Sequence, residues 1–221
     1  MEQGSFDIDR ILHAVARMIH MERLEDKTTL GQISVKEDPF RVLIATILSA
    51  RTRDETTLAA SHRLFAKYPN VQSLARAKAD SVRKLIKPVG FYNTKASRII
   101  EAANLLIRKH GGKVPESLEE LLGLPGVGRK TANCVLVYGF RKPAIPVDTH
   151  VHRISNRLGL CETKTPEETE IELMRTVNSK FWLDINELFV RFGQEVCRPI
   201  GPKCSVCLLN KECKYAIREA T

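Results

Sequence analysis

The chain has 221 residues, of which 43% are apolar and 28% are charged. This composition is typical of a folded globular protein and excludes a disordered chain, and the length suffices for a buried core in one domain or two. Because no apolar run approaches the roughly 18 residues of a membrane span and no signal-peptide pattern is present, we expect a cytoplasmic protein without a membrane partner.

Positive charge is concentrated in the middle of the chain. The formal net charge is +9 at pH 7, and residues 51–113 carry 14 Lys or Arg against 4 Asp or Glu. Residues 1–50 are net negative, with 6 basic against 8 acidic side chains. An excess confined to one segment favours a polyanion as the binding partner.

The first half of the chain reads as a series of helices. Asp7 or Asp9 can cap the first, and Asp38-Pro39 is a strong start signal for the second. Asp54 is expected to cap the third, which runs to about Phe65. The spacing of apolar residues predicts further helices over 71–77, 81–86 and 94–110.

Residues 117–132 have the pattern of a helix-hairpin-helix. A short helix is expected to end at Pro125, and a second begins at Arg129. Between them, Gly126 and Gly128 permit a positive φ and a close approach of the backbone to a partner. The exposed amides of such a turn suit a phosphate group.

The second half continues the helical pattern. Val147-Asp148-Thr149-His150 opens a helix with Asp148 at its cap, and Thr165-Pro166 opens the next. Apolar residues between 183 and 192 indicate a last long helix. Since no segment shows sustained period-2 alternation, the chain is predicted to be all-α.

A cysteine array follows this last helix. Its four members have the spacing C-x6-C-x2-C-x5-C within 17 residues: Cys197, Cys204, Cys207 and Cys213. A reducing compartment disfavours the alternative of two disulfides. Four thiolates so close together indicate a metal centre, and their spacing leaves Zn²⁺ and an iron–sulfur cluster open. Cys134 and Cys161 lie outside the array and are interpreted as small apolar residues.

The hairpin, the 147–150 segment and the cysteines, in this order, make the chain resemble the endonuclease III family of helix-hairpin-helix DNA glycosylases and AP lyases. The resemblance runs from the first helix to Cys213. Leu48-Ser49-Ala50 and Gly90-Phe91-Tyr92-Asn93-Thr94-Lys95-Ala96 look like the two DNA-probing loops of that family.

The resemblance implies two all-α domains with a DNA-binding cleft between them. Residues 31–146 would form a six-helix domain with the hairpin, and residues 1–30 plus 147–221 a cluster domain. By the same resemblance, the four cysteines hold a [4Fe-4S] cluster instead of zinc. The expected partner is double-stranded DNA with damaged bases or abasic sites, bound by a monomer associated with the nucleoid.

The resemblance assigns Lys130 as the nucleophile of a bifunctional enzyme that removes oxidised pyrimidines. The amine would displace a flipped base and form a Schiff base, and β-elimination would cleave 3′ of the abasic site. A free lysine has a pKa of ~10.4. A helix N-terminus and partial desolvation both lower the pKa, which increases the fraction of neutral amine. Asp148 would help to deprotonate Lys130 and stabilise positive charge on the sugar. The alternatives for Lys130 are a solvated charge or a simple phosphate contact. The alternative for Asp148 is a plain helix cap.

The hairpin is expected to anchor the DNA backbone. The amides of Leu124, Gly126 and Gly128, beside Arg129, would bind a phosphate, and the hairpin carbonyls would hold a monovalent cation. His150 would contact DNA or orient the segment of Asp148, with a structural role as the alternative.

The two probing loops are expected to extrude the damaged nucleotide. Arg51 stands where the family usually has glutamine, and it would fill the gap left by the flipped nucleotide. Phe91 would insert as an apolar wedge between bases. The alternative for Phe91 is a core position.

Other functions fit parts of the pattern. A monofunctional mismatch glycosylase acting on T/G or A/G pairs would typically lack lysine at position 130. A non-catalytic hairpin protein that only binds DNA would require neither Lys130 nor Asp148. A redox protein built around the cluster would leave the hairpin and the basic segment unexplained.

Overall fold

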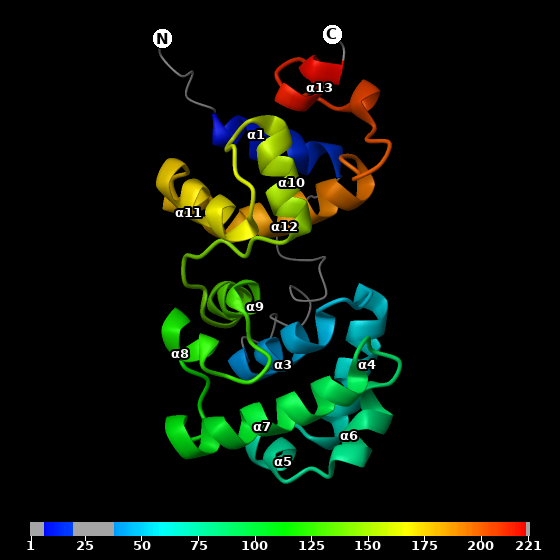
Figure 1. Ribbon diagram of the computed structural model, residues 1–221, viewed down its shortest axis with the longest axis vertical. Coiled ribbons are helices and arrows are strands. Elements are labelled where there is room, and N and C mark those ends of the chain that lie inside the picture. The colour runs from blue at the N-terminus through cyan, green and yellow to red at the C-terminus, as the bar shows by residue number, and fades with distance from the viewer. Residues whose placement is uncertain (1–6, 20–37, 220–221) are drawn as a thin grey trace. The chain divides into compact units, whose positions relative to one another are not determined.

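The computed structural model describes residues 7–19 and 38–219. These residues form helices and connecting turns without a strand, which confirms the predicted all-α class (Figure 1). Contacts divide the chain into two compact units, Met1–Leu24 with Pro143–Thr221, and Glu25–Lys142. The predicted domain boundary at residues 30 and 31 lies outside the described residues. Within the described ranges, no helix is long and apolar enough to span a membrane.

The Glu25–Lys142 unit is built around one buried helix. Its elements are α3 (Pro39–Ser49), α4 (Asp54–Lys67), α5 (Val71–Ala75), α6 (Ala79–Ile86), α7 (Tyr92–His110), α8 (Leu118–Leu122), α9 (Arg129–Cys134) and the π-helix η1 (Val135–Gly139). Helix α3 contacts α4, α7, α9 and η1, and it is apolar on nearly every face, as a central helix must be. The predicted cap is confirmed, because the Asp38 carboxylate accepts a hydrogen bond from the Phe40 amide at 3.0 Å.

Three predicted helix starts in this unit are wrong, and one of them is that of α6, which begins at Ala79 instead of residue 81. Asp54 is the first residue of α4, not its cap, and Arg53 precedes it without a side-chain hydrogen bond. An acidic side chain at that position still favours the helix through its dipole. Helix α7 begins at Tyr92, two residues earlier than predicted. The reason is that Phe91 takes a left-handed conformation and its carbonyl accepts the Lys95 amide at 3.0 Å.

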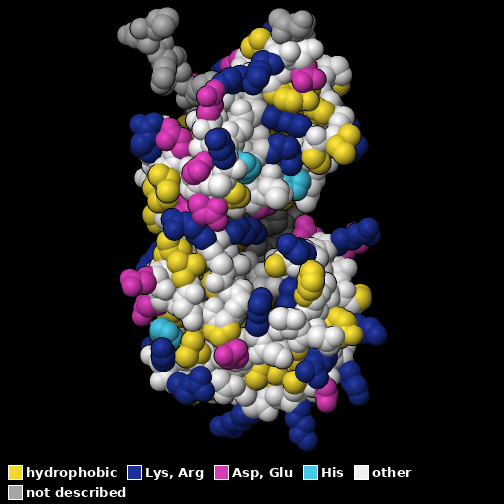
Figure 2. All heavy atoms as spheres, in the orientation of Figure 1, with side chains coloured by type: hydrophobic (Ala, Val, Ile, Leu, Met, Phe, Trp, Pro, Cys, Tyr) yellow, Lys and Arg dark blue, Asp and Glu magenta, His cyan; other side chains and the backbone are white. Residues whose placement is uncertain are grey.

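Basic side chains do not gather into one patch on the face of this unit that Figure 2 shows. Figure 2 shows Lys and Arg scattered over the visible face of the unit that holds α3 to α9. This is the part of the sequence that carries the positive excess. The charge therefore provides a general attraction for a polyanion instead of marking a single site.

The other unit packs its helices around α12. Its elements are α1 (Ile8–Met18), α10 (Thr149–Leu158), α11 (Pro166–Thr176), η2 (Ser179–Phe181), α12 (Trp182–Glu195), η3 (Cys204–Val206) and α13 (Lys214–Glu219). Helix α12 contacts both α1 and α10, with Phe189 and Phe192 fully buried among them. Of the two predicted caps of α1, the structure shows Asp7, and Thr165 caps α11 in a capping box with Glu168.

Candidate active site

Helices α8 and α9 form the predicted hairpin. The Ser117 hydroxyl accepts the Glu120 amide at 3.3 Å, so α8 begins as predicted. It ends at Leu122, earlier than the expected stop at Pro125, because Gly123 already closes the helix with hydrogen bonds to carbonyls of the preceding turn. Proline therefore stands in the turn, beyond the helix.

The two glycines of the turn differ in conformation. Gly126 has φ +81°, and a Cβ there would lie 3.2 Å from the Arg98 side chain, so both backbone and packing favour glycine. Gly128 has φ −100°, which corrects the expectation of a positive φ at this position. A Cβ on Gly128 would have nothing within 4 Å, so the chain itself leaves this face of the turn open.

The hairpin amides are not equally available to a phosphate. Leu124 is buried and its amide donates to the Leu121 carbonyl at 3.1 Å, which corrects its predicted role as a phosphate donor. In the described part of the chain, the amides of Gly126 and Gly128 donate no hydrogen bond. Two of the three predicted donors therefore remain suited to an anion.

Lys130 lies at the start of α9, directly after this turn. It is the second residue of the helix and half-buried, and Arg129 precedes it, also half-buried. Gly128 is the N-cap and supplies no side chain to the first-turn amides. The positive end of the helix dipole thus acts on the Lys130 amine without a capping oxygen from the N-cap residue.

Arg51 and Phe91 occupy two adjacent loop tips, the Arg51 loop (residues 50–52) and the Phe91 loop (residues 89–91). Both residues are left-handed, with φ 53° and 57°, which is unusual for residues other than glycine. Phe91 is 62% exposed, so the alternative of a core position is excluded. The Arg51 guanidinium lies 5.7 Å from the centroid of the Phe91 ring. The structure therefore brings both predicted DNA-probing side chains together.

Asp148 caps α10, as predicted. One carboxylate oxygen, Oδ1, accepts the amides of His150 and Val151, each at 2.9 Å. The connector before it is fixed by Asn186, whose Nδ2 donates to the Pro146 carbonyl at 2.7 Å. Asp148 belongs to the Pro143–Thr221 part of one unit and Lys130 to the Glu25–Lys142 unit, so each is described only by its contacts within its own unit.

His150 packs inside its own unit. Its Nδ1 lies 3.2 Å from the Arg153 guanidinium, and a Cβ on Gly193 would meet that same nitrogen at 2.3 Å. Helices α10 and α12 therefore approach closely at this histidine. This packing supports the structural alternative over a DNA contact.

The four cysteines surround one cavity. This partly open cavity is lined by all four residues of the array, together with Arg157, Lys203, Asn210 and several apolar side chains. Burial raises the pKa of the Cys204 and Cys207 thiols, and the neighbouring cysteines raise the pKa of both thiols further. Thiolates crowded in this way require positive charge, which a metal centre supplies.

The described side chains of His, Cys, Asp and Glu do not gather in threes or more around a point where one metal ion could sit. Structural zinc sites and iron–sulfur clusters both use four cysteine sulfurs. The donor set that lines this cavity is therefore compatible with either kind of metal centre.

Arg157 supports the cysteine array from α10, a role that the sequence did not indicate. Its guanidinium donates to the Arg198 carbonyl at 2.7 Å and lies 3.5 Å from the Cys197 sulfur. It also stacks 4.3 Å from the Tyr215 ring centroid. The array is thus braced by a fixed positive charge from another helix.

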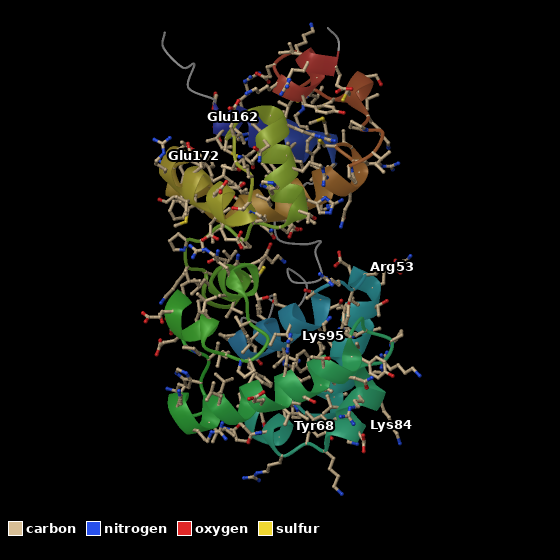
Figure 3. All side chains as sticks on the ribbon, viewed as in Figure 1. Arg53, Tyr68, Lys84, Lys95, Glu162 and Glu172 are labelled. Atoms are coloured by element: carbon tan, nitrogen blue, oxygen red, sulfur yellow. The ribbon has the colours of Figure 1, made fainter. Side chains whose placement is uncertain are left out.

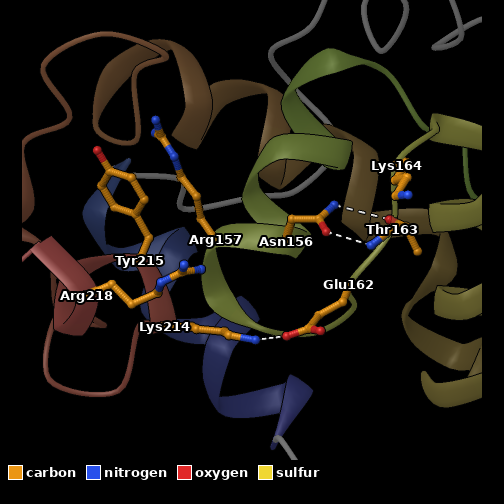
Figure 4. A pocket seen from close by; sticks show the side chains of 8 residues that line it. All are labelled: Asn156, Arg157, Glu162, Thr163, Lys164, Lys214, Tyr215 and Arg218. Carbon is orange, nitrogen blue, oxygen red and sulfur yellow. Dashed lines mark hydrogen bonds and ion pairs between the residues drawn. The ribbon is translucent and has the colours of Figure 1, made fainter.

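An open pocket lies beside this array (Figure 4). Some of its polar groups pair with each other: Lys214 pairs with Glu162, and the Thr163 amide donates to Asn156 at 2.8 Å. Arg157, Lys164 and Arg218 also line this pocket.

Comparisons with known proteins place the chain in a family. Residues 44–179 match the HhH-GPD superfamily of base excision DNA repair proteins. Endonuclease III of Thermotoga maritima is 56% identical over 178 residues, which cover 80% of this chain and 84% of that protein. The chain belongs to the endonuclease III family. It is therefore a DNA glycosylase and AP lyase of base excision repair.

Solved structures of the family have the same fold. The structure of a trapped endonuclease III–DNA covalent intermediate matches with a TM-score of 0.84 and 33% identity, over 97% of each chain. A thermostable thymine-DNA glycosylase matches with a TM-score of 0.82 and 26% identity, over 95% of this chain and 96% of that one. The higher identity to endonuclease III favours its activity over that of a mismatch glycosylase.

Lys95 is a buried lysine in a segment that was predicted to be a DNA-probing loop, and no separate role was predicted for it. It is only 6% exposed, and it reaches from α7 to the end of α3 (Figure 3). A signal was present, because positions 95, 99, 102 and 106 share one helix face and the last three are apolar. A lysine on that stripe is placed to be buried.

The pKa of Lys95 provides a test of this burial. Desolvation lowers it from 10.5 to about 8. Between these values the unfolded chain binds more protons than the folded chain, so this group makes the free energy of unfolding rise with pH across that window. We expect the Lys95 Cε resonance, assigned with Lys95→Arg, to titrate with a midpoint near pH 8. A midpoint at the ordinary lysine value would contradict the burial of the amine.

Proposed function

We propose that this protein removes oxidised pyrimidines from duplex DNA and then cleaves the strand 3′ of the abasic site, with Lys130 as the nucleophile. The observation that supports this most strongly is a half-buried lysine in the first turn of α9, directly after an open glycine turn. The positive end of a helix dipole disfavours a protonated amine. Neither a phosphate contact nor a solvated charge requires a lysine at such a position.

The chemistry follows from that placement. The neutral amine attacks C1′ of the flipped nucleotide, the C1′–N bond to the base breaks, and the base leaves with a proton. After the attached nitrogen loses a proton, its lone pair expels O4′, which takes up a proton, and the opened sugar carries a protonated imine at C1′. The imine acidifies C2′, so loss of a C2′ proton expels the 3′ phosphate oxygen. Water then hydrolyses the imine and frees Lys130 for another turnover.

Asp148 is proposed to accept the proton from Lys130 and to stabilise positive charge on the sugar. Its position supports this, since both cap hydrogen bonds use Oδ1 and neither uses Oδ2. The buried bond between Asn186 and Pro146 keeps the connector rigid, which general base catalysis requires.

Damaged duplex DNA is the proposed partner. The Gly126 and Gly128 amides, with Arg129 beside them, would hold a phosphate, while Arg51 and Phe91 would enter the base stack. Two exposed tips held in left-handed conformations support a role in contact with a ligand, because such strain concentrates at functional sites. A monovalent cation at the hairpin carbonyls and the DNA-binding role of His150 stay predictions.

One assay tests the proposed reaction. Duplexes with an oxidised pyrimidine, a T/G mismatch or an A/G mismatch are incubated with the protein and analysed with and without later alkali. We expect strand cleavage without alkali on the oxidised pyrimidine alone. Cleavage that appears only after alkali, and only on a mismatch, would support the monofunctional alternative instead.

The four cysteines are proposed to hold a [4Fe-4S] cluster. When bound, the cluster would supply the positive iron charge that keeps the four thiols ionised. Arg157 and the surrounding apolar side chains would shield it from water. No catalytic step at Lys130 requires it, so its proposed role is to order residues 197–213.

Replacement of one cysteine tests this assignment. Cys207→Ser is expected to remove most of the bound iron and acid-labile sulfide and to reduce hydrogen-exchange protection in residues 197–219. Protection of α3 to α9 should change little, because these helices form a separate compact unit. Cys161→Ser is the matched control, since Cys161 is buried but does not line the cysteine cavity. Zinc in place of iron in the purified wild-type protein would reject the cluster, and full retention of iron and sulfide by Cys207→Ser would reject Cys207 as a required ligand.

A further inference from the structure

The Lys95 ammonium joins α7 to the end of α3 through three hydrogen bonds. Its Nζ donates to the Leu48 carbonyl at 2.7 Å, to the Ala50 carbonyl at 2.6 Å and to the Thr52 hydroxyl at 3.2 Å. Two of the three acceptors belong to the Arg51 loop. Charge-assisted bonds of this kind in a water-excluded position are strong and directional.

The Thr52 hydroxyl connects this ammonium to the second loop. The Gly90 amide donates to the same oxygen at 3.1 Å. The backbones of the two loops also touch, because a Cβ on Gly90 would lie 2.6 Å from the Arg51 carbonyl. Lys95, Thr52 and Gly90 therefore form one continuous polar link beneath both loops.

The link lies under two strained residues. Arg51 and Phe91 are left-handed, and both side chains are exposed at the tips of their loops. Strained backbone of this kind persists only where the surrounding structure determines it fully. Among the described residues no carboxylate pairs with Lys95, so its charge is neutralised mainly by carbonyl dipoles of the Arg51 loop and α3.

We propose that Lys95 is a positioning residue that locks the Arg51 and Phe91 loops into one arrangement, so that both side chains enter the base stack together. This inference rests on the proposed function, which gives the two loops their role in nucleotide extrusion. Lys95 itself touches neither DNA nor the reacting atoms in this scheme.

A purely structural lysine has different consequences. As a cap for the carbonyl end of α3, Lys95 would stabilise the helix through its dipole and affect folding alone. Its loss would then lower every activity in proportion to the folded fraction. A positioning role predicts a selective loss on substrates that require extrusion from a base stack.

Single-turnover excision of an oxidised pyrimidine distinguishes the two roles. The lesion is placed either in a fully paired duplex or in a short unpaired bubble, where little unstacking is required. Lys95→Met is expected to lower the duplex-to-bubble ratio of rate constants by about tenfold or more, the scale of a lost charge-assisted hydrogen bond. Lys95→Arg, which can still donate to the carbonyls, should recover part of the ratio. Lys109→Met, on the exposed side of α7, should leave the ratio unchanged.

A double-mutant cycle shows whether Lys95 acts through the loops. Adding Lys95→Met to an Arg51→Ala, Phe91→Ala protein should lower the ratio little further, because the groups it positions are already absent. If Lys95→Met does not fold, Thr52→Ala takes its place, since that change removes the oxygen shared by Lys95 and Gly90.

Each outcome decides a separate point. A wild-type protein that cleaves neither duplex nor bubble overturns the proposed function, and this inference with it. An active wild type combined with an unchanged ratio in both Lys95→Met and Thr52→Ala overturns the inference alone. So does an effect of Lys95→Met that is fully additive to loss of the two loop side chains.

Discussion

Lys130→Ala is expected to abolish the borohydride-trapped adduct with abasic DNA and to lower the strand-cleavage rate by about 10³-fold or more, the scale of a lost nucleophile. The physical reason is that no imine can form without the amine. Binding to the same DNA should change only a few-fold, because the glycine amides and the basic surface remain. Lys130 is half-buried at a helix start, so the melting temperature should change little.

Lys130→Arg separates chemistry from charge. An arginine keeps the positive charge that a phosphate contact would use, but its guanidinium stays protonated and cannot act as the nucleophile. We expect Lys130→Arg to be as inactive as Lys130→Ala in strand cleavage. Substantial cleavage by Lys130→Arg would favour the phosphate-contact alternative.

Asp148→Asn should have the second-largest effect. Asparagine caps a helix about as well as aspartate, so α10 and the fold should be retained. The proton acceptor is lost, and we expect the single-turnover rate to fall by about 10²-fold, the lower range for general base catalysis.

Asp148→Ala provides the comparison. It removes the cap as well as the base and should cost about 1 kcal/mol of stability beyond Asp148→Asn. Thermal unfolding of both variants, measured beside their excision rates, resolves the two functions of this carboxylate. If Asp148→Asn were as active as the wild type, Asp148 would act only as a helix cap and not as a base.

The features predicted well from the sequence depend on local interactions. Asp38 and Asp148 cap helices that begin one residue later, and these bonds span only two or three residues. The hairpin likewise follows from Pro, Gly and the apolar spacing within one short stretch. Local hydrogen bonds and backbone preferences therefore suffice to place these elements.

The features that were missed depend on contacts between distant segments. Lys95 finds its acceptors 43 to 47 residues away, and Arg157 reaches Cys197 over 40 residues. The Leu124 amide is an exception: it was predicted to face a phosphate, but a hydrogen bond to Leu121, only three residues away, already satisfies it. The sequence shows which groups are present, whereas the fold decides which of them already have partners.

Identification of the trapped residue is the most direct test of the central claim. Wild-type protein is incubated with duplex DNA that carries an oxidised pyrimidine, and borohydride reduces the imine that joins them. The covalent complex is then digested and its peptides are analysed by mass spectrometry. We predict that the sugar remnant lies on Lys130. A remnant on another amine, Lys95 included, would contradict the assignment of Lys130 as the nucleophile.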